Sequence, residues 1–381
     1  MIRLAEFCVE RTKTIAVVGL LLLIVGVIGL FQIRVNNNLV HWFKYNSDVR
    51  TADRVMSTKL GGTSTAYLVV QTEKDDAIKD PAMLRGIEGL QRELESDPRI
   101  GKTFSVVDYV KRINLVLHDN DATFNRVPDT ADEAGQYLFL FGMSAKPRDL
   151  DNVVDYPFRK ANIMLQLKTW DADVMADIIK RTEKYLSVHP LPSSATIHPA
   201  GIAYFNLIWN NEVLNGMMNS FIAGLVMVLI LLMIQMRSFW WGVLSYIPLF
   251  FTIVLIYGAV GIFGKDFDMP VAVLSTLSLG MAVDFAIHFV GRFQQRYKEQ
   301  PNLREALIWT VVRPGKGVLL NAVLFAIGFS VMVFAELTPY ITVGAFMAAI
   351  MLFSALFSII YLPGLITIFK PILIKGDKRD A

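Results

Sequence analysis

Six long apolar runs constrain this chain more than any other feature of its sequence. Five of the six contain no acidic or basic residue. The runs cover residues 14–33, 216–236, 239–264, 269–290, 317–335 and 340–369. Each is close to or above the roughly 20 residues that a helix needs to cross a hydrocarbon core of about 30 Å. Because lipid offers no hydrogen-bond partners, each run must satisfy its own backbone groups as a helix. The sequence therefore predicts an α-helical membrane protein with six transmembrane helices.

The first run is predicted to be an uncleaved membrane anchor. Its apolar stretch is longer than the roughly 7–15 residues usual in a signal peptide, and the residues after it, Arg34, Val35 and Asn36, do not form a small-residue cleavage site. The single cysteine, Cys8, excludes an intramolecular disulfide. The formal net charge of +3 and the lack of a basic patch interleaved with aromatic residues give no indication of nucleic-acid binding.

Basic residues are distributed unequally between the two sides that these helices define. Fourteen lie on the side of the two termini, whereas the short loops on the other side hold one, Lys265. The positive-inside rule places the side with fourteen in the cytoplasm. We therefore expect a multi-pass protein of the inner (plasma) membrane with both termini cytoplasmic. Its expected parts are residues 1–33 with the first helix, an extracytoplasmic (periplasmic) domain over 34–212, helices two to six over 213–370, and a cytoplasmic tail over 371–381.

Residues 34–212 have the composition of a folded polar domain. They hold 22 of the basic and 24 of the acidic residues, and this near balance argues against a surface that binds polyanions. The spacing of apolar residues changes along the segment between the periods of strand and helix. Strands are expected at 65–70, 103–107, 161–167 and 195–199, and helices at 80–96, 110–118, 130–141 and 172–187. This order suits an α+β, ferredoxin-like domain built from two βαβ units.

The same segment offers no recognisable catalytic constellation. It has no nucleophile elbow, P-loop or zinc-ligand spacing, and His41, His118, His189 and His198 are scattered along it. We therefore expect no enzyme activity, no metal and no cofactor. The sequence His41–Trp42–Phe43 follows the first helix closely and is typical of an aromatic anchor at the membrane interface.

Asp284 is the one acidic residue inside the apolar runs. It lies about 14 residues into the fourth predicted helix, or roughly 20 Å at 1.5 Å per residue. An ionised Asp near the centre of a bilayer costs about 2.5–3.5 kcal/mol on insertion scales, so we expect it to face other helices or water. A carboxyl group in such a place can take up and release a proton. A structural polar contact between helices is the alternative interpretation.

Two further polar residues extend this hypothesis. Gly280, Asp284 and His288 are spaced four apart and therefore share one face of the helix. Histidine exchanges protons near neutral pH, so a proton path could run from Asp284 through His288 to the cytoplasm, although His288 could instead only contact headgroups or a carbonyl. Asn321 in the fifth helix is a candidate partner for Asp284, or a plain hydrogen-bonding residue between helices.

The arrangement resembles the half-repeat of the resistance–nodulation–division (RND) superfamily: one helix, a large outer domain, then five helices. It is most similar to the MMPL-type predicted exporters, whose five-helix block is related to the sterol-sensing domain. The run Gly280–Phe289, GMAVDFAIHF, resembles their GxxxDY motif and its trailing AIHF. Leu60–Gly62 and Ser105–Asp108 are also similar to segments of these exporters. The resemblance covers essentially the whole chain, and the topology is its specific part.

This resemblance implies efflux driven by proton antiport, with hydrophobic or lipid-like molecules as substrate. It implies that Asp284 is the proton-coupling residue, that His288 assists, and that Gly280, Phe285 and Asn321 support them. Two departures matter. Phe285 stands where the family usually has Tyr, and the chain has one six-helix half where full-length members have two. It is therefore expected either to form a homo-oligomer, to pair with a second six-helix half, or to be part of a longer or split protein.

Other functions remain open on the sequence alone. One is a non-transporting lipid-sensing or assembly partner built on a sterol-sensing-like membrane block. Another is a protein-export accessory, although the signature of that branch is missing from the fourth helix. Sodium could replace protons as the coupling ion, but the only hydroxyls in the same helix, those of Ser275, Thr276 and Ser278, are distant from Asp284, which favours protons.

Overall fold

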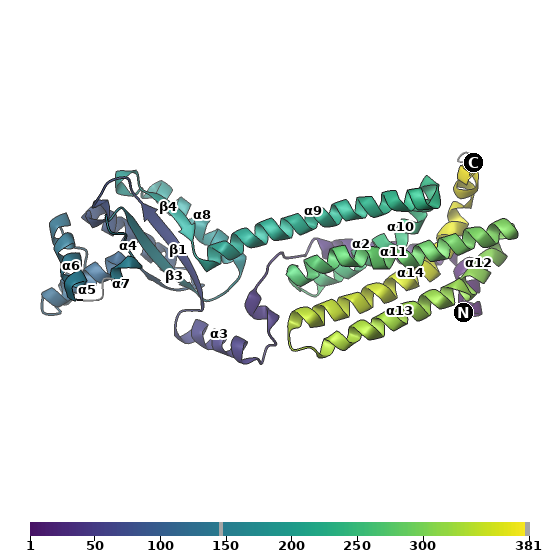
Figure 1. Ribbon diagram of the computed structural model, residues 1–381, viewed down its shortest axis with the longest axis horizontal. Coiled ribbons are helices and arrows are strands. Elements are labelled where there is room, and N and C mark those ends of the chain that lie inside the picture. Colours follow the sequence, from purple (N-terminus) through teal and green to yellow (C-terminus); the bar gives the residue numbers. More distant parts are fainter. Residues whose placement is uncertain (145–147, 378–381) are drawn as a thin grey trace. The chain divides into compact units, whose positions relative to one another are not determined.

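A computed structural model describes residues 1–144 and 148–377 of the chain (Figure 1). The chain divides into two compact units. Met1–Asn37 and Glu212–Ala381 form the first, here called the helical unit, and Asn38–Asn211 form the second, here called the α/β unit. The chain passes between them at residues 37–38 and 211–212.

Six segments have the length and apolarity to cross a membrane, which confirms that prediction for the described part of the chain. They are α2 (Thr12–Leu30), α9 (Ile202–Met236), α10 (Phe239–Ile262), α11 (Met269–Glu299), the segment Leu303–Phe334 and α14 (Thr338–Asp377). The fifth comprises α12 (Leu303–Val312), α13 (Pro314–Ser330) and the 3₁₀ helix η5 (Val331–Phe334), and a short helix α1 (Ile2–Glu10) precedes α2.

The α11 helix continues well beyond the apolar run that predicted it. Asp268 caps its first turn by accepting a hydrogen bond from the Val271 amide at 3.2 Å, and Pro270 occupies a position where a missing N–H costs little. The expected end at Val290 is where apolarity stops, but the helix runs on to Glu299. Basic side chains in the last turn favour this extension because their positive charge is attracted to the negative end of the helix dipole.

The helical unit is organised around α14, which packs against α2, α10, α11 and α13 (Figure 1). Helices α2 and α10 approach each other closely through glycines. A Cβ atom at Gly29 would overlap the Gly258 carbonyl, and one at Gly258 would overlap the Gly26 carbonyl. Small residues at such crossings allow two membrane helices to bring their backbones into contact.

Contacts at the helix ends show which connections share a side of the helical unit. At one end, Arg304 of α12 forms an ion pair with Glu10 of α1 at 3.0 Å. At the other end, the Phe267 amide donates to the Arg34 carbonyl at 2.8 Å, and Asn36 Nδ2 donates to Asp266 Oδ2 at 3.2 Å. The helices therefore alternate in direction as a membrane topology requires.

The α/β unit is built on a four-stranded sheet of order β2-β3-β1-β4, in which every neighbouring pair is antiparallel. Its strands are β1 (Ser64–Gln71), β2 (Ile100–Phe104), β3 (Lys160–Leu167) and β4 (Thr196–Ala200). Its helices are α3 (Asp48–Lys59), α4 (Pro81–Glu95), α5 (Val106–Leu117), α6 (Ala131–Ser144), α7 (Arg148–Asp151) and α8 (Ala172–Val188), with 3₁₀ turns η1 (Leu39–Trp42), η2 (Ala77–Lys79), η3 (Ala122–Phe124) and η4 (Pro192–Ser194).

Two β-α-β connections cover this sheet with helices. Helix α4 links β1 to β2, α8 links β3 to β4, and in each case the two strands enclose one antiparallel strand between them (Figure 1). Side chains of β1 alternate between buried and half-buried, as a sheet with one covered face requires. Ala66, Leu68 and Val70 form a common core with apolar residues of α4 and α8.

The prediction of a strand over 103–107 was wrong at its second half. Strand β2 ends at Phe104, and α5 begins at Val106, four residues before the expected helix. Ser105 Oγ accepts from the Val107 amide at 3.1 Å, and Asp108 Oδ2 accepts from the Ser105 amide at 2.9 Å. This capping box starts a helix inside a sequence whose β-branched residues favour a strand.

Candidate functional site

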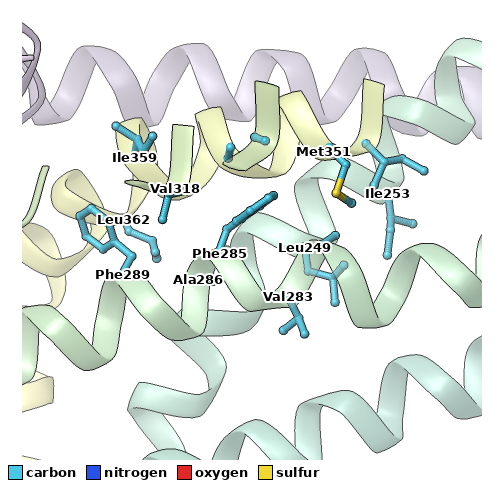
Figure 2. Close-up of a cluster of buried hydrophobic side chains, with 14 of the residues drawn as sticks. Leu249, Ile253, Val283, Phe285, Ala286, Phe289, Val318, Met351, Ile359 and Leu362 are labelled. Atoms are coloured by element: carbon cyan, nitrogen blue, oxygen red, sulfur yellow. The ribbon is translucent and has the colours of Figure 1, made fainter. Parts of the chain in front are cut away.

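The candidate site lies on α11 and is held by the apolar side of that helix. Phe285, Ala286 and Phe289 are buried in a cluster that also contains Val318 of α13 and residues of α14 (Figure 2). Large aromatic rings packed in this way fix the rotation of α11 about its own axis. The side chains on its opposite face are therefore held at defined positions.

Gly280, Asp284 and His288 lie on that opposite face, and all three are exposed. A Cβ added at Gly280 would meet no atom within 4 Å, so the surface beside the carboxylate is open. Within residues 1–144 and 148–377, the side chains of Asp284 and His288 take part in no hydrogen bond or ion pair. The chain thus presents an acidic and a basic side chain, one helical turn apart, on an uncovered stretch of a membrane-spanning helix.

Asn321 is exposed on α13, between Val318 and Ala322, which are buried. No hydrogen bond joins it to Asp284 in the described part of the chain. Its amide is presented at the surface of the helical unit, as the Asp284 carboxylate is. Both groups are available to water or to a second protein.

Phe285 points away from the carboxylate beside it. Its side chain is only 3% exposed and lies in the apolar cluster drawn in Figure 2. Successive side chains on an α-helix are turned by about 100°, so residue 285 cannot share the face of Asp284. A tyrosine at this position would bring its polar hydroxyl group into the apolar cluster. These surroundings therefore favour phenylalanine.

One polar contact near the site was not anticipated from the sequence. Ser354 of α14 is fully buried, and its Oγ donates to the Ala282 carbonyl of α11 at 2.5 Å. The bond ties α11 to the central helix two residues before Asp284. The signal in the sequence is the pair Ser354 and Ser358, one helical turn apart in an otherwise apolar run, and both prove to be fully buried.

The histidines of the α/β unit lie in separate surroundings. His118 stacks on Phe124 with ring centroids 3.7 Å apart, and its Nδ1 lies 2.9 Å from the Asn114 carbonyl oxygen. His189 stacks on Tyr185, whereas His198 lies beside Thr196. No group of three or more His, Cys, Asp or Glu side chains suited to a metal is found over the described ranges.

Comparison with known proteins relates these features to a family. The model of the MMPL family matches residues 44–380, which include the α/β unit from α3 onward and α9 to α14. A protein of Methanocaldococcus jannaschii that is named as a membrane protein is 22% identical over 338 residues. That alignment covers 84% of this chain and 83% of the relative. The two proteins are therefore similar over most of their lengths.

Proposed function

This chain belongs to the MMPL family of RND-type membrane transporters, and we propose that it uses a proton gradient to export hydrophobic or lipid-like molecules across or out of the inner membrane. Membership of this family implies that the chain is a transporter and not an enzyme. The observation that carries the proposal is the exposed carboxylate of Asp284 on a membrane-spanning helix.

The energetic argument follows from where this carboxylate lies. An ionised Asp facing lipid near the bilayer centre is unfavourable by about 2.5–3.5 kcal/mol on insertion scales, whereas a protonated Asp is neutral. Protonation is therefore coupled to whether this face of α11 meets lipid, water or protein. A proton gradient can drive that change because the two sides of the membrane supply protons at different chemical potential. His288, one turn further along the same open face, is the group that would pass the proton onward.

A route from α11 to the α/β unit supports this mechanism. Residues before α11 are bonded to the segment after α2, through Phe267 to Arg34 and Asp266 to Asn36. The chain then enters the α/β unit, where Asn38 Nδ2 donates to Asp171 Oδ1 at 2.9 Å. A shift of α11 against α14 would be carried through these bonds and the backbone between Asn36 and Asn38. The α/β unit would respond by moving substrate.

We further propose that the α/β unit is an extracytoplasmic, ferredoxin-like porter domain and that both termini are cytoplasmic. The strand order β2-β3-β1-β4, with each βαβ connection enclosing one antiparallel strand, supports the first point. Fourteen basic residues on the side of the termini support the second. The alternating helix ends described above are compatible with both.

The working transporter is proposed to contain at least two six-helix halves, from two copies of this chain or from this chain and a partner. Supporting this, only 6% of the most apolar window of α9 and 17% of that in the Leu303–Phe334 segment are buried within the chain. Asp284 and Asn321 also lie on open faces. The mass of the complex extracted in mild detergent would decide between one half and two.

Asp284→Asn tests the mechanism directly. The variant keeps the shape of the side chain but cannot exchange a proton, so gradient-dependent export from proteoliposomes should fall to background while membrane insertion stays normal. Asp119→Asn is the matched control, because Asp119 is exposed at a positive φ that asparagine tolerates. Export by Asp284→Asn at the unmodified rate would contradict the proposal.

A cavity in the helical unit favours a second candidate, lipid sensing without transport. It has a volume of about 330 Å³ and is lined by apolar residues of α2, α10 and α14, among them Leu22, Leu255, Phe353 and Phe357. Such a space suits an acyl chain or a ring system. This candidate predicts saturable lipid binding that neither a proton gradient nor Asp284→Asn alters, together with no flux in proteoliposomes.

A further inference from the structure

We propose that the α/β unit binds amphiphiles that carry a positive charge, in a groove beside α6. The inference rests on the proposed export function and names the class of substrate. The groove has a volume of about 520 Å³, within the roughly 300–1,000 Å³ typical of small-molecule sites. It lies among α6, α7, η2 and the turn before β3, and every residue that lines it belongs to the α/β unit.

The groove presents large apolar side chains that the fold leaves uncovered. Phe139 is 67% exposed, Met143 is 71% exposed and Tyr156 is 98% exposed. All three line the groove, together with the half-buried Leu150 and Phe158. Aromatic and methionine side chains gathered at one opening are typical of a surface that receives an apolar ligand. An alkyl chain lying there would remove this surface from water.

Glycines on α6 create the space for such a chain. Gly135 and Gly142 both line the groove, and Phe139 lies between them on the same face of the helix. A Cβ at Gly142 would meet no atom within 4 Å, and one at Gly135 would only touch the Lys79 side chain at 3.7 Å. Packing therefore does not require glycine at either position, although glycine weakens a helix. The absent side chains instead leave the floor of the groove free.

The charged side chains that line the groove determine whether a positively or a negatively charged ligand is favoured. They are the carboxylates of Asp76, Asp151 and Asp155 and the ammonium of Lys79, a formal charge of −2. Lys79 is already engaged, since its Nζ lies 2.6 Å from Asp76 Oδ1 and 4.1 Å from the centre of the Phe158 ring. Asp155 accepts a hydrogen bond from the Lys160 amide at 2.8 Å, which holds its carboxylate at the turn. Among the described residues that line the groove, acidic side chains therefore outnumber basic ones by two, and the charge of Arg159, which pairs with Asp75, also acts on Asp155.

A neighbouring cavity continues this acidic rim. It has a volume of about 370 Å³, shares Asp76, Lys79 and Phe139 with the groove, and adds the carboxylate of Asp132. A cationic head group would meet the carboxylates and the face of an aromatic ring, whereas an anionic head would be repelled. The same acidic rim disfavours contact with anionic lipid headgroups, so a membrane surface is a poorer occupant than a cationic amphiphile.

The test uses the full chain in nanodiscs of zwitterionic lipid, titrated calorimetrically with decyltrimethylammonium and with decyl sulfate below their aggregation concentrations. These probes share one alkyl chain and differ in charge. Saturable binding of the cation, at least about tenfold tighter than binding of the anion, is expected.

Gly142→Leu should fill the groove and weaken that binding at least about tenfold while the α/β unit stays folded. Gly216→Leu on α9 is the control, since an added Cβ there also meets nothing within 4 Å.

Asp151→Asn tests the contribution of the groove's charge to binding, because it removes a negative charge and keeps the shape of the side chain. It should weaken binding of the cation several-fold, whereas decyl sulfate should bind at least as tightly as it binds to the unmodified chain. Equal binding of the two probes, or unchanged binding in Gly142→Leu, would overturn the inference. Binding needs no proton gradient, so these outcomes are distinct from the export assay. Loss of export in Asp284→Asn with normal binding would support both proposals, whereas selective binding by a chain that never exports would remove only the proton-driven function.

Discussion

The two units of this protein treat their polar side chains in opposite ways. In the α/β unit, Gln91 is only 6% exposed and sits among partners. Its Nε2 donates to Thr103 Oγ1 at 3.1 Å and to Asp108 Oδ2 at 3.0 Å, and its Oε1 accepts from Ser105 Oγ at 2.8 Å. In the helical unit, Asp284, His288 and Asn321 are exposed on helices of a membrane-spanning unit. Gln91 thus finds its partners within the chain, whereas Asp284, His288 and Asn321 present their polar groups outward.

This difference separates polar side chains whose partners lie within the chain from polar side chains whose partners must come from the surroundings. Water can solvate an exposed polar group on the α/β unit at little cost, so its surface needs no partner. Lipid cannot solvate a carboxylate, so the open face of α11 requires a proton, water or another protein. The protonation and surroundings of this face therefore depend on conditions outside the chain, and the proposed proton coupling would use that dependence.

The largest effect is expected where the helical unit is fully packed. Gly258→Leu would drive a side chain into the Gly26 backbone of α2, an overlap that neither helix can relieve by a rotamer change. We expect a loss of about 3 kcal/mol or more in stability, seen as low membrane yield and early thermal unfolding in detergent. Gly328→Leu on α13 is the control, because a Cβ there meets nothing within 4 Å, and it should behave like the unmodified chain. Equal stability of the two variants would mean that α2 and α10 do not cross as closely as described.

A smaller effect is expected from breaking the polar network of the α/β unit. Gln91→Leu removes one hydrogen-bond partner from each of Thr103, Ser105 and Asp108, and the buried Ser105 hydroxyl loses its acceptor, a loss that costs about 1–3 kcal/mol. We expect faster hydrogen exchange of the amides in Ile100–Phe104, with exchange in α10 and α14 unaffected. Gln71→Leu, at an exposed end of β1, provides the comparison. Exchange that also accelerates in α14 would contradict the expectation that the loss stays within the α/β unit.

The sequence predicted different parts of this structure for different physical reasons. The six apolar runs were sufficient to predict six spanning helices, because length and apolarity alone decide that property. The spacing of Gly280, Asp284 and His288 placed them correctly on one helical face, since helix periodicity is local. That this face is uncovered, that Phe285 points into the core and that Ser354 holds α11 all depend on how α13 and α14 pack. The sequence marks Ser354 and Ser358 as a polar pair in an apolar run, but local spacing does not specify which atoms such residues contact.

The smallest effect concerns an ion pair at the edge of the α/β unit and its dependence on pH. A side-chain hydrogen bond from Arg99, at 2.8 Å, is the main reason that the pKa of Asp97 lies below its ordinary value, and Arg181 contributes to the same shift. The folded state therefore favours the ionised carboxylate more than the unfolded state does. The resulting stability is fully present above the unfolded-state pKa of about 3.9 and is lost as pH falls through the lower folded-state pKa.

Asp97→Asn should accordingly weaken the α/β unit at neutral pH by about 1 kcal/mol or less, because Arg99 is partly exposed and solvent screens the pair. The difference from the unmodified chain should shrink as pH falls below about 4, because the Asp97 carboxylate of the unmodified chain is then progressively protonated. Hydrogen exchange of the amides in Ile100–Phe104 between pH 7 and pH 3, corrected for intrinsic rates, measures this. A difference that stays constant with pH would mean that Asp97 acts through its shape and not its charge. At each pH, Asp97→Asn should leave hydrogen exchange in α11 as it is in the unmodified chain, because the basic partners of Asp97, Arg99 and Arg181, both belong to the α/β unit.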